Sequence, residues 1–287
     1  MIALDRTSPV GRALRLSAVA LAVFFLSGLA SYPLERSAWK RVSANLNELR
    51  VEDLENALGQ GVVLGVLGGF RTLIADLLFI ELSVHWQQKD WAKVEALVPV
   101  VTSVDPRSHF FWLNTSRMVA YDIPVWRIRQ QNATFRDGGS DRRLTPEEEF
   151  IITREQAAKA IEILERGLLY HPNDARLLQD IASTHLNKLG DQATAAEYYL
   201  KAWRGENRRF FHARLHAQLL ANLGRNAEAL AFLREHYEEI PKDHPFSRPA
   251  VVLERIRQLE SVLNVPESER FSPTEPPPVD RFSEDNL

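Results

Sequence analysis

The chain of 287 residues contains no cysteine. This excludes disulfides, a thiolate nucleophile, a cysteine-based zinc site and the N-terminal cysteine that a bacterial lipoprotein anchor requires. An excess of positive charge is also missing, because 35 Lys and Arg stand against 38 Asp and Glu, for a formal net charge of -3. A chain without a broad basic field is a poor ligand for nucleic acid, so we expect no nucleic-acid partner.

Motifs for catalysis and cofactor binding are lacking as well. His212 and His216 have a spacing that would bring two imidazoles to one helix face, but no third ligand has a matching spacing. Gly138-Gly139 follows no predicted strand and has no phosphate-binding lysine beside it. We therefore expect no metal, no cofactor and no catalytic residue, and we interpret both histidines as packed or solvated side chains.

The N-terminal region carries a long uncharged apolar run, residues 16–34. At about 1.5 Å per residue it covers roughly 28 Å, close to the ~30 Å core of a bilayer. Tyr32 and Trp39 lie where interfacial aromatic residues are favoured. We interpret the run as a single transmembrane signal-anchor helix, with residues 1–15 in the cytoplasm and the body in the periplasm or another extracytoplasmic space.

Two alternatives to a retained anchor stay open. Gly28-Leu29-Ala30 resembles a small-x-small cleavage site, so the run is also compatible with a signal peptide that is removed. A buried helix of a soluble protein is the other alternative.

Residues 35–69 are predicted to form a juxtamembrane helix and a glycine-rich connection. Apolar residues recur there at steps of three and four, as in an amphipathic helix. They are Trp39, Val42, Leu46 and Leu49. A second span over Val62–Val84 would bury Arg71, Asp76 and Glu81 at about 2.5–3.5 kcal/mol each, so we expect a buried helix there.

Self-similarity at a period of about 34 residues is the main signal in the body, residues 70–245. Prolines close successive apolar helices, since proline cannot donate the next helical hydrogen bond. The recurring prolines are Pro106, Pro172 and Pro241. Small and large residues recur at fixed positions of this period, where small ones would let paired helices cross closely and a large one would fill the gap to the next pair. The small ones are Ser116, Ala182, Ala195, Ala217, Gly224 and Ala229, and the large ones are Leu78, Trp112, Leu178, Tyr199 and Leu233.

This pattern resembles the tetratricopeptide repeat, a helix–turn–helix module. The resemblance implies an all-α solenoid of about four helix pairs that begin at residues 75, 109, 175 and 210. A non-repetitive helical bundle is the alternative, and Glu81 and His216 stand where the family usually has leucine.

The repeats contain two interruptions. An insertion, residues 122–146, splits the second repeat, and its stretch from Asp137 to Asp141 has the composition of a loop. Thr145 and Pro146 then predict the start of a helix, with Thr145 as N-cap and Pro146 at the first position. A one-residue insertion precedes Ala195 in the third repeat.

The C-terminal region is predicted to cap the stack and then to become disordered. Residues 246–263 contain a helix whose apolar face would cover the last pair. Its apolar residues are Val251, Ile256, Leu259 and Leu263. Residues 264–287 are rich in proline and acid, which is typical of a disordered tail.

In the tetratricopeptide family the first helix of each pair lines a partner-binding groove. The resemblance carries this role to Arg176, Gln179, Ser183, Asn187, Phe211, Arg214, Gln218 and Asn222. The amides would bind the backbone of a guest segment, and Arg176 and Arg214 would hold a carboxylate. The same positions of the second repeat form a more apolar surface, at Phe110, Leu113, Arg117 and Tyr121. The alternative is that these side chains are merely exposed and polar.

Together these patterns predict a membrane-anchored scaffold of bacterial type that binds other proteins in a membrane or cell-envelope complex. Its expected contacts are other proteins and the lipid bilayer at residues 16–34. A structural subunit built permanently into a larger membrane assembly is the first alternative, and an enzyme is the second.

Overall fold

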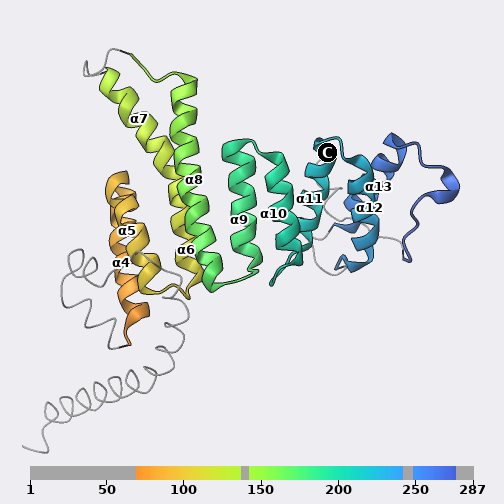
Figure 1. Cartoon of the computed structure of the whole chain (residues 1–287), viewed down its shortest axis with the longest axis horizontal. Coiled ribbons are helices and arrows are strands. Elements are labelled where there is room, and N and C mark those ends of the chain that lie inside the picture. The colour runs from red at the N-terminus through yellow and green to blue at the C-terminus, as the bar shows by residue number, and fades with distance from the viewer. Residues whose placement is uncertain (1–68, 137–141, 242–247, 276–287) are drawn as a thin grey trace, which may run out of the picture. The chain divides into compact units, whose positions relative to one another are not determined.

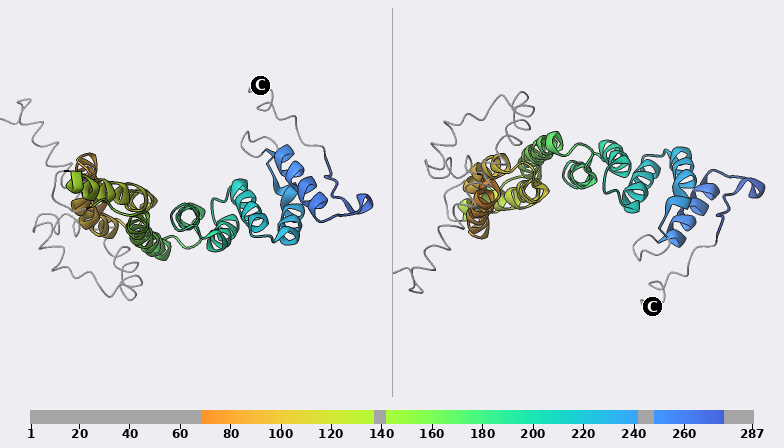
Figure 2. Two further views of the ribbon diagram at one scale, coloured as in Figure 1. Left: turned by 90° about the horizontal axis from the view of Figure 1, so that it is seen from above. Right: turned by 90° about the horizontal axis from the view of Figure 1, so that it is seen from below.

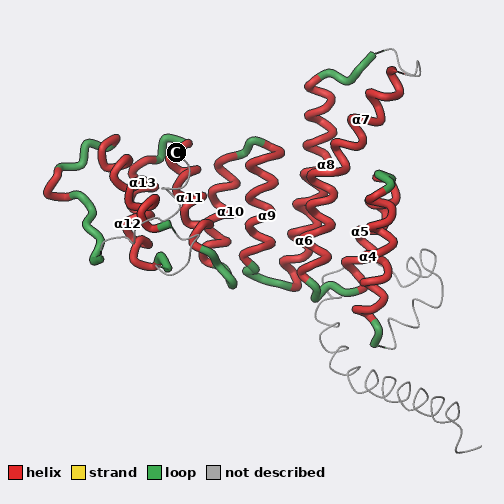
Figure 3. Tube along the Cα trace, turned by 180° about the vertical axis from the view of Figure 1, so that it is seen from behind, coloured by secondary structure: helices red, strands yellow, loops and turns green. Residues whose placement is uncertain are grey.

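The computed structural model describes residues 69–136, 142–241 and 248–275. The predicted transmembrane run 16–34 and the predicted juxtamembrane region up to residue 68 lie outside these residues. Every regular element that the structure describes is a helix, which confirms the all-α class for this part of the chain (Figure 3). None of the described helices is both long enough and apolar enough to cross a membrane. The chain divides into two units, Met1–Phe111 and Trp112–Leu287.

In unit 1, helices α4 (Arg71–Gln87) and α5 (Trp91–Val104) form a packed pair. Helix α5 begins at Trp91 because the carboxylate of Asp90 accepts a hydrogen bond from the backbone N–H of Lys93 and caps the helix. Thr72 Oγ1 donates to Asp105 Oδ2 at 3.0 Å, which ties the start of α4 to the end of α5. The pair corresponds to the first predicted repeat.

In unit 2, each helix from α8 to α13 packs against the next helix along the chain (Figures 1 and 2). Helix α6 crosses the boundary between the two units. The elements are α6 (His109–Arg117), the π-helix η1 (Met118–Asp122), α7 (Ile123–Arg136), α8 (Pro146–Tyr170), α9 (Ala175–Thr184), the π-helix η2 (His185–Leu189), α10 (Gln192–Arg204), α11 (Phe210–Asn222), α12 (Asn226–His236), η3 (Tyr237–Glu239), α13 (Pro249–Val262) and η4 (Glu267–Glu269).

Small side chains lie in the core where these helices approach one another. Ala182, Ala195 and Ala229 are fully buried, and Ala217 is 2% exposed. Alanine loses no side-chain entropy on burial and lets two backbones come close. The large residues predicted for the same core are buried as well, namely Leu78, Trp112, Leu178, Tyr199 and Leu233.

A close approach joins Trp112 of α6 to Gly167 of α8. A Cβ at Gly167 would lie 3.0 Å from Cγ and 3.1 Å from Cδ2 of the indole. Trp112 is only 1% exposed and also stacks on Tyr170, so its ring has no room to retreat. Position 167 therefore requires glycine for a packing reason rather than a conformational one.

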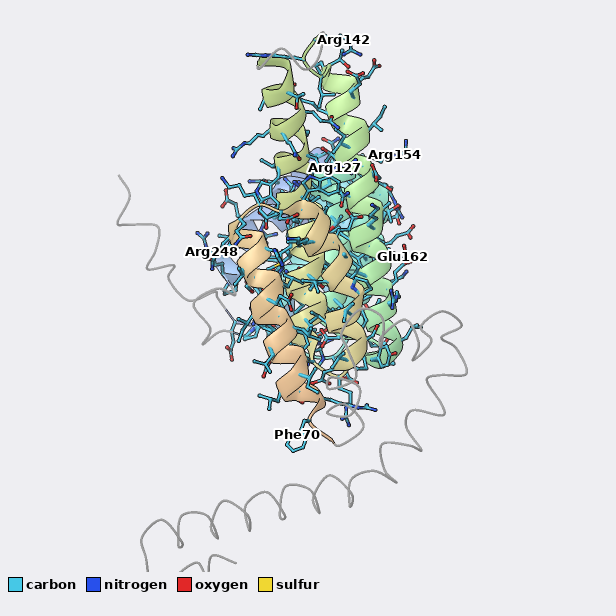
Figure 4. The ribbon with its side chains drawn as sticks, turned by 90° about the vertical axis from the view of Figure 1, so that its left-hand side faces the viewer. Phe70, Arg127, Arg142, Arg154, Glu162 and Arg248 are labelled. Atoms are coloured by element: carbon cyan, nitrogen blue, oxygen red, sulfur yellow. The ribbon has the colours of Figure 1, made fainter. Side chains whose placement is uncertain are left out.

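Helix α8 begins as predicted. Thr145 caps it, Pro146 occupies the first turn, and Glu148 returns a hydrogen bond to the Thr145 backbone, which completes a capping box. At Glu148 the pKa of the carboxyl is lowered to about 2 by the bidentate Arg142 guanidinium and by the Thr145 N–H. Figure 4 shows Arg142 at the tip of the hairpin that α7 and α8 form.

Part of the predicted insertion 122–146 is helical, because residues Ile123–Arg136 form α7. Helix α7 continues from α6 through η1 and packs on α8, where Arg127 Nη1 donates to Glu155 Oε2 at 3.1 Å (Figure 4). The loop composition begins only at Asp137, and residues 137–141 lie outside the described part of the chain. The insertion thus lengthens the second pair.

The one-residue insertion of the third repeat coincides with a π-helical turn. Residues His185–Leu189 form η2, which follows α9 and ends at Gly190 with φ of 67°. A π turn holds one residue more than an α turn, so it absorbs the extra residue without breaking the helix. η1 occupies a similar place at the end of α6.

The predicted capping helix is present as α13, and it packs on α12. Ile256 and Leu259 are buried, whereas Leu263 is exposed, because α13 ends before it. The prediction of a disordered tail is wrong for residues 264–275. Phe271 packs against the core with Tyr237, and its backbone N–H donates to Glu260 Oε1 at 2.6 Å.

The buried carboxylate of Glu260 explains why the first part of the tail packs. Its side chain is fully buried and also accepts from Arg234 at 2.7 Å and Arg257 at 2.8 Å. A buried carboxylate needs donors, and the Phe271 N–H supplies one that no helix can provide. The amino-acid composition of the tail does not reveal that the buried Glu260 needs these hydrogen-bond donors.

We expect Gly167→Ala to destabilise the protein by about 1–2 kcal/mol, because overpacking against Trp112 outweighs the better helix propensity of alanine. The measurement is urea denaturation of the detergent-solubilised full chain, followed by circular dichroism. Glu162→Ala is the matched control, since Glu162 points outward from the same helix (Figure 4). Equal midpoints for Gly167→Ala and the wild type would contradict the close crossing.

Candidate functional site

Four of the eight residues predicted to bind a partner line two separate hollows of unit 2, Ser183 and Asn187 in one and Arg214 and Gln218 in the other. We call them the Asp180 hollow, of about 350 Å³, and the Arg214 hollow, of about 330 Å³. The Asp180 hollow lies between α6–η1 and α9–η2. The Arg214 hollow lies between α11 and α13. The Asp180 hollow is lined by Ser116, Arg117, Tyr121, Asp122, Asp180, Ser183, Thr184 and Asn187. The Arg214 hollow is lined by Arg214, Leu215, Gln218, Leu233, Val251, Val252, Glu254, Arg255 and Gln258.

A bidentate ion pair forms the floor of the Asp180 hollow. Arg117 donates from Nε to Asp180 Oδ2 at 2.6 Å and from Nη2 to Oδ1 at 3.1 Å. Asp180 is 7% exposed, and burial raises the pKa of its carboxyl while the Arg117 guanidinium opposes that rise. The pair links α6 to α9 and leaves little free charge for a ligand.

Apart from the carboxylate of Asp122, neutral polar groups line the rest of the Asp180 hollow. Ser183 Oγ and Tyr199 OH share a hydrogen bond of 3.0 Å. The amide of Asn187 is exposed on η2 and has no hydrogen-bond partner among the residues that the structure describes. Lys188 Nζ lies 4.2 Å from the centre of the Tyr121 ring, a cation–π contact that joins η2 to η1. This hollow therefore offers amide and hydroxyl groups beside the carboxylate of Asp122.

Between the hollows, α9 and α11 are joined by a buried hydrogen bond. Gln179 Oε1 lies 3.2 Å from His212 Nε2, and the backbone N–H of Arg209 donates to His212 Nδ1. These partners assign the proton to Nε2 of a neutral ring. Burial, and the nearby Arg209 charge, lower the pKa of His212 to about 4. The predicted groove residue Gln179 is thus used within the fold.

His216 is also a core residue. Its Nδ1–H donates to the Ala196 carbonyl at 2.7 Å, its ring packs edge-on against Phe232, and burial lowers its pKa. Within the described ranges, no three His, Asp or Glu side chains gather as metal ligands.

Arg214 is the central feature of its hollow. The side chain is half-buried between the aliphatic walls of Leu215, Leu233 and Val252, and it has no carboxylate partner in the part of the chain that the structure describes. Burial, and the positive charge of Arg248, lower the pKa of Arg214. The guanidinium stays protonated at neutral pH, so the hollow holds an uncompensated cation.

A second donor in the Arg214 hollow is unsatisfied. The Nε–H of Arg255 is buried and has no acceptor among the described residues, although its Nη1 donates to Gln258 Oε1 at 3.1 Å. The nearby carboxylate of Glu254 instead accepts from Gln258 Nε2 at 3.3 Å. Buried donors without acceptors are rare, because each costs about 1–3 kcal/mol. The hollow is therefore suited to an anionic acceptor.

The other predicted groove residues have partners of their own. Arg176 holds Asp174, the N-cap of its helix, at 2.8 Å, so its predicted role in carboxylate binding is not supported by a free guanidinium. Phe211 is half-buried against His212, with ring centres 4.2 Å apart. Gln218 Nε2 donates to Asn222 Oδ1 at 2.8 Å. The structure does not bring the eight residues into one site.

Sequence reasoning missed Asp180 and Arg255. Asp180 stands inside the apolar run that contains Leu177, Leu178 and Ile181, and a carboxylate at a core-facing position needs a cationic partner. That signal was readable from the sequence. Arg255 looked like one more exposed base on an amphipathic helix, and only packing shows that its Nε is buried.

No family model and no curated protein sequence matches the chain. The resemblance to tetratricopeptide proteins therefore depends on the residues and spacing given above. The candidate site has to be argued from its own geometry.

We expect stability to fall as the pH drops from about 6.5 to about 4, because an unfolded histidine binds a proton near pH 6.5 whereas His212 resists protonation in the fold. Because the pKa of His212 is lower in the folded than in the unfolded state, its titration leaves the free energy of unfolding unchanged above pH 6.5. Below pH 4 it lowers the free energy of unfolding by up to about 3 kcal/mol. The measurement is urea denaturation at pH 7.5 and pH 4.5. In His212→Gln, which cannot titrate, the loss should be clearly smaller; an equal loss in both proteins would contradict this origin.

Proposed function

We propose that this chain is a membrane-anchored scaffold of the tetratricopeptide type, whose helical body binds other proteins within a membrane or cell-envelope complex. The sequential packing of α8 to α13 and the buried small residues at their crossings support a solenoid. A solenoid exposes long surfaces with little core of its own, which suits binding rather than catalysis.

The observation that carries the proposal is the unpaired, half-buried Arg214. Partial burial of a cation is costly unless an anion compensates it. Arg117 and Arg176 both have carboxylate partners within unit 2, whereas Arg214 has none among the described residues. We infer that the missing anion is supplied by a bound protein.

The chemistry of the hollow defines the ligand class. Arg214 and the Arg255 Nε–H supply charge-assisted donors for one carboxylate, while Leu215, Leu233 and Val252 suit an adjoining apolar side chain. The proposed ligand is thus a peptide segment in which an acidic residue or a C-terminal carboxylate stands next to an apolar residue. The free amide of Asn187 offers a backbone contact in the Asp180 hollow, as a separate point of attachment.

The proposal places the body outside the cytoplasm, behind a single transmembrane helix at residues 16–34. Its support is the length and apolar composition of that run, with an N-terminus whose layout resembles a signal sequence. We assign no catalytic role, because the polar clusters of the described residues are ion pairs and hydrogen bonds that serve packing.

A permanently assembled structural subunit is the second candidate. The observation that favours it is the apolar surface on the α7–α8 hairpin, where Phe150 is 49% and Ile151 is 62% exposed. Neighbouring exposed apolar side chains of this size commonly mark protein contacts. In that case the hairpin, rather than Arg214, would hold the partner.

We expect Arg214→Ala to weaken partner recovery about 10- to 100-fold, since a charge-assisted hydrogen bond contributes about 1.5–3 kcal/mol. The measurement is affinity purification of the tagged full chain from detergent-solubilised membranes, with quantitative mass spectrometry of the recovered proteins. Arg154→Ala is the matched control, because Arg154 is an exposed arginine on α8 (Figure 4). Both variants should retain the thermal stability of the wild type.

Undiminished recovery with Arg214→Ala would overturn the carboxylate site. Were recovery lost instead in a Phe150→Ser, Ile151→Ser variant, the permanently assembled subunit would be the better account.

We expect the full chain to stay in the membrane pellet after a carbonate wash, because an apolar run of this length anchors stably in a bilayer. The check is immunoblotting of pellet and supernatant, together with N-terminal sequencing. A soluble form that begins near Ser31 would show cleavage and remove the anchor from the proposal.

A further inference from the structure

Helix α4 carries an apolar stripe that nothing in the described part of unit 1 covers. Leu73, Leu77, Ile80 and Val84 are between 45% and 59% exposed. Their steps of four, three and four residues place them on one face of an α-helix. We call this set the α4 stripe.

The opposite face of α4 is already in use. Ala75, Leu78 and Leu82 are buried and pack the helix on α5. A surface helix normally has one apolar face, and a helix that is apolar on two faces is normally covered on both. Four exposed aliphatic side chains in line therefore indicate an occupant.

The charges beside the stripe restrict what the occupant can be. Asp76 and Glu81 are exposed and lie along its two edges, and neither forms an ion pair with a cation that the structure describes. A second copy of the stripe would bring like charges together, which is unfavourable. An anionic bilayer surface would repel the same carboxylates. The suitable occupant is an amphipathic helix with basic edges.

We propose that residues 39–50 of the same chain pack as a helix on the α4 stripe. This segment lies outside the described residues, and its apolar residues Trp39, Val42, Leu46 and Leu49 have steps of three, four and three. Both stripes would be about 15–17 Å long at 1.5 Å per residue, so their lengths match. The two helices then form a hairpin that covers the second face of α4.

Charge and connectivity support this pairing. On a helical projection Arg36 and Arg50 fall on one side of the segment's apolar face, where they can meet an acid at the edge of the α4 stripe. The connection from Arg50 to Arg71 contains about 20 residues, ample to close such a hairpin. Because the contact is within one chain, its effective concentration is high.

The absence of cysteine allows a direct test by disulfide crosslinking. In the full chain in native membranes, Leu46→Cys combined with Leu77→Cys should form an intramolecular disulfide on mild oxidation. These positions are near the middle of each stripe, so the pair should crosslink whichever way the segment runs. The control combines Leu46→Cys with Ala96→Cys, an exposed position on α5, and should crosslink at least ten times less. Mass spectrometry of the digested protein identifies the linked peptides.

Two results would overturn the proposal. If Leu77→Cys alone gives a disulfide-linked dimer in high yield, a second copy covers the stripe. If the double variant gives no more intramolecular disulfide than the control pair, residues 39–50 do not lie on α4.

A charge exchange provides a second measurement that does not depend on cysteine geometry at one position. Asp76→Arg with Glu81→Arg should reduce the intramolecular crosslink several-fold. Adding Arg36→Glu and Arg50→Glu should restore it. If the crosslink yield is the same in both charge variants as in the original cysteine pair, the assigned charge pairing is wrong, and with it the choice of this segment.

Discussion

How closely two consecutive helices can cross is the constraint on which the described structure depends. Fully buried alanines lie along the core of unit 2, and at Gly167 even a single methyl group would press into Trp112. The same principle applies in the connection after α10, where a Cβ at Gly205 would collide with the Asn173 carbonyl. Because each helix is held mainly by its neighbours in the chain, an error in one crossing is passed on to the next pair. Side-chain size at a few positions therefore fixes where the first helices stand and which residues line the hollows between them.

The arginines of unit 2 differ in whether a carboxylate of the same chain pairs with them. Arg117 has Asp180, Arg176 has Asp174, and Arg234 shares Glu260 with a neighbouring base. These pairs connect or cap helices and are explained by the structure alone. Arg214 differs from them, since no described carboxylate pairs with it and the positive charge of Arg248 lowers its pKa. Among the described arginines, Arg214 is therefore the one on which the proposed binding of an anionic segment depends.

The helical class, the α8 cap and the buried positions of the repeats could be predicted from the sequence, because they depend on local spacing and on single residues such as Thr145. The packing of the tail and the division of the groove could not. Phe271 is held by Glu260, whose demand for donors arises only once its helix is buried. Gln179 is withdrawn from the surface by His212, a contact between residues of different repeats. Alignment to a repeat assigns side chains to a face, but it does not show which of them the protein uses internally.

The π-helical turn η2 has a consequence for how recognition surfaces change in such a fold. One extra residue in a helix turns everything that follows it by about 100° relative to the preceding face. Asn187 lies within η2, whereas Asn222 ends the regular α-helix α11. A single codon gained or lost at such a turn would re-aim one side chain while leaving the packed core around Ala182 and Ala195 in place. In a chain built this way, binding specificity can change by rotation as well as by substitution.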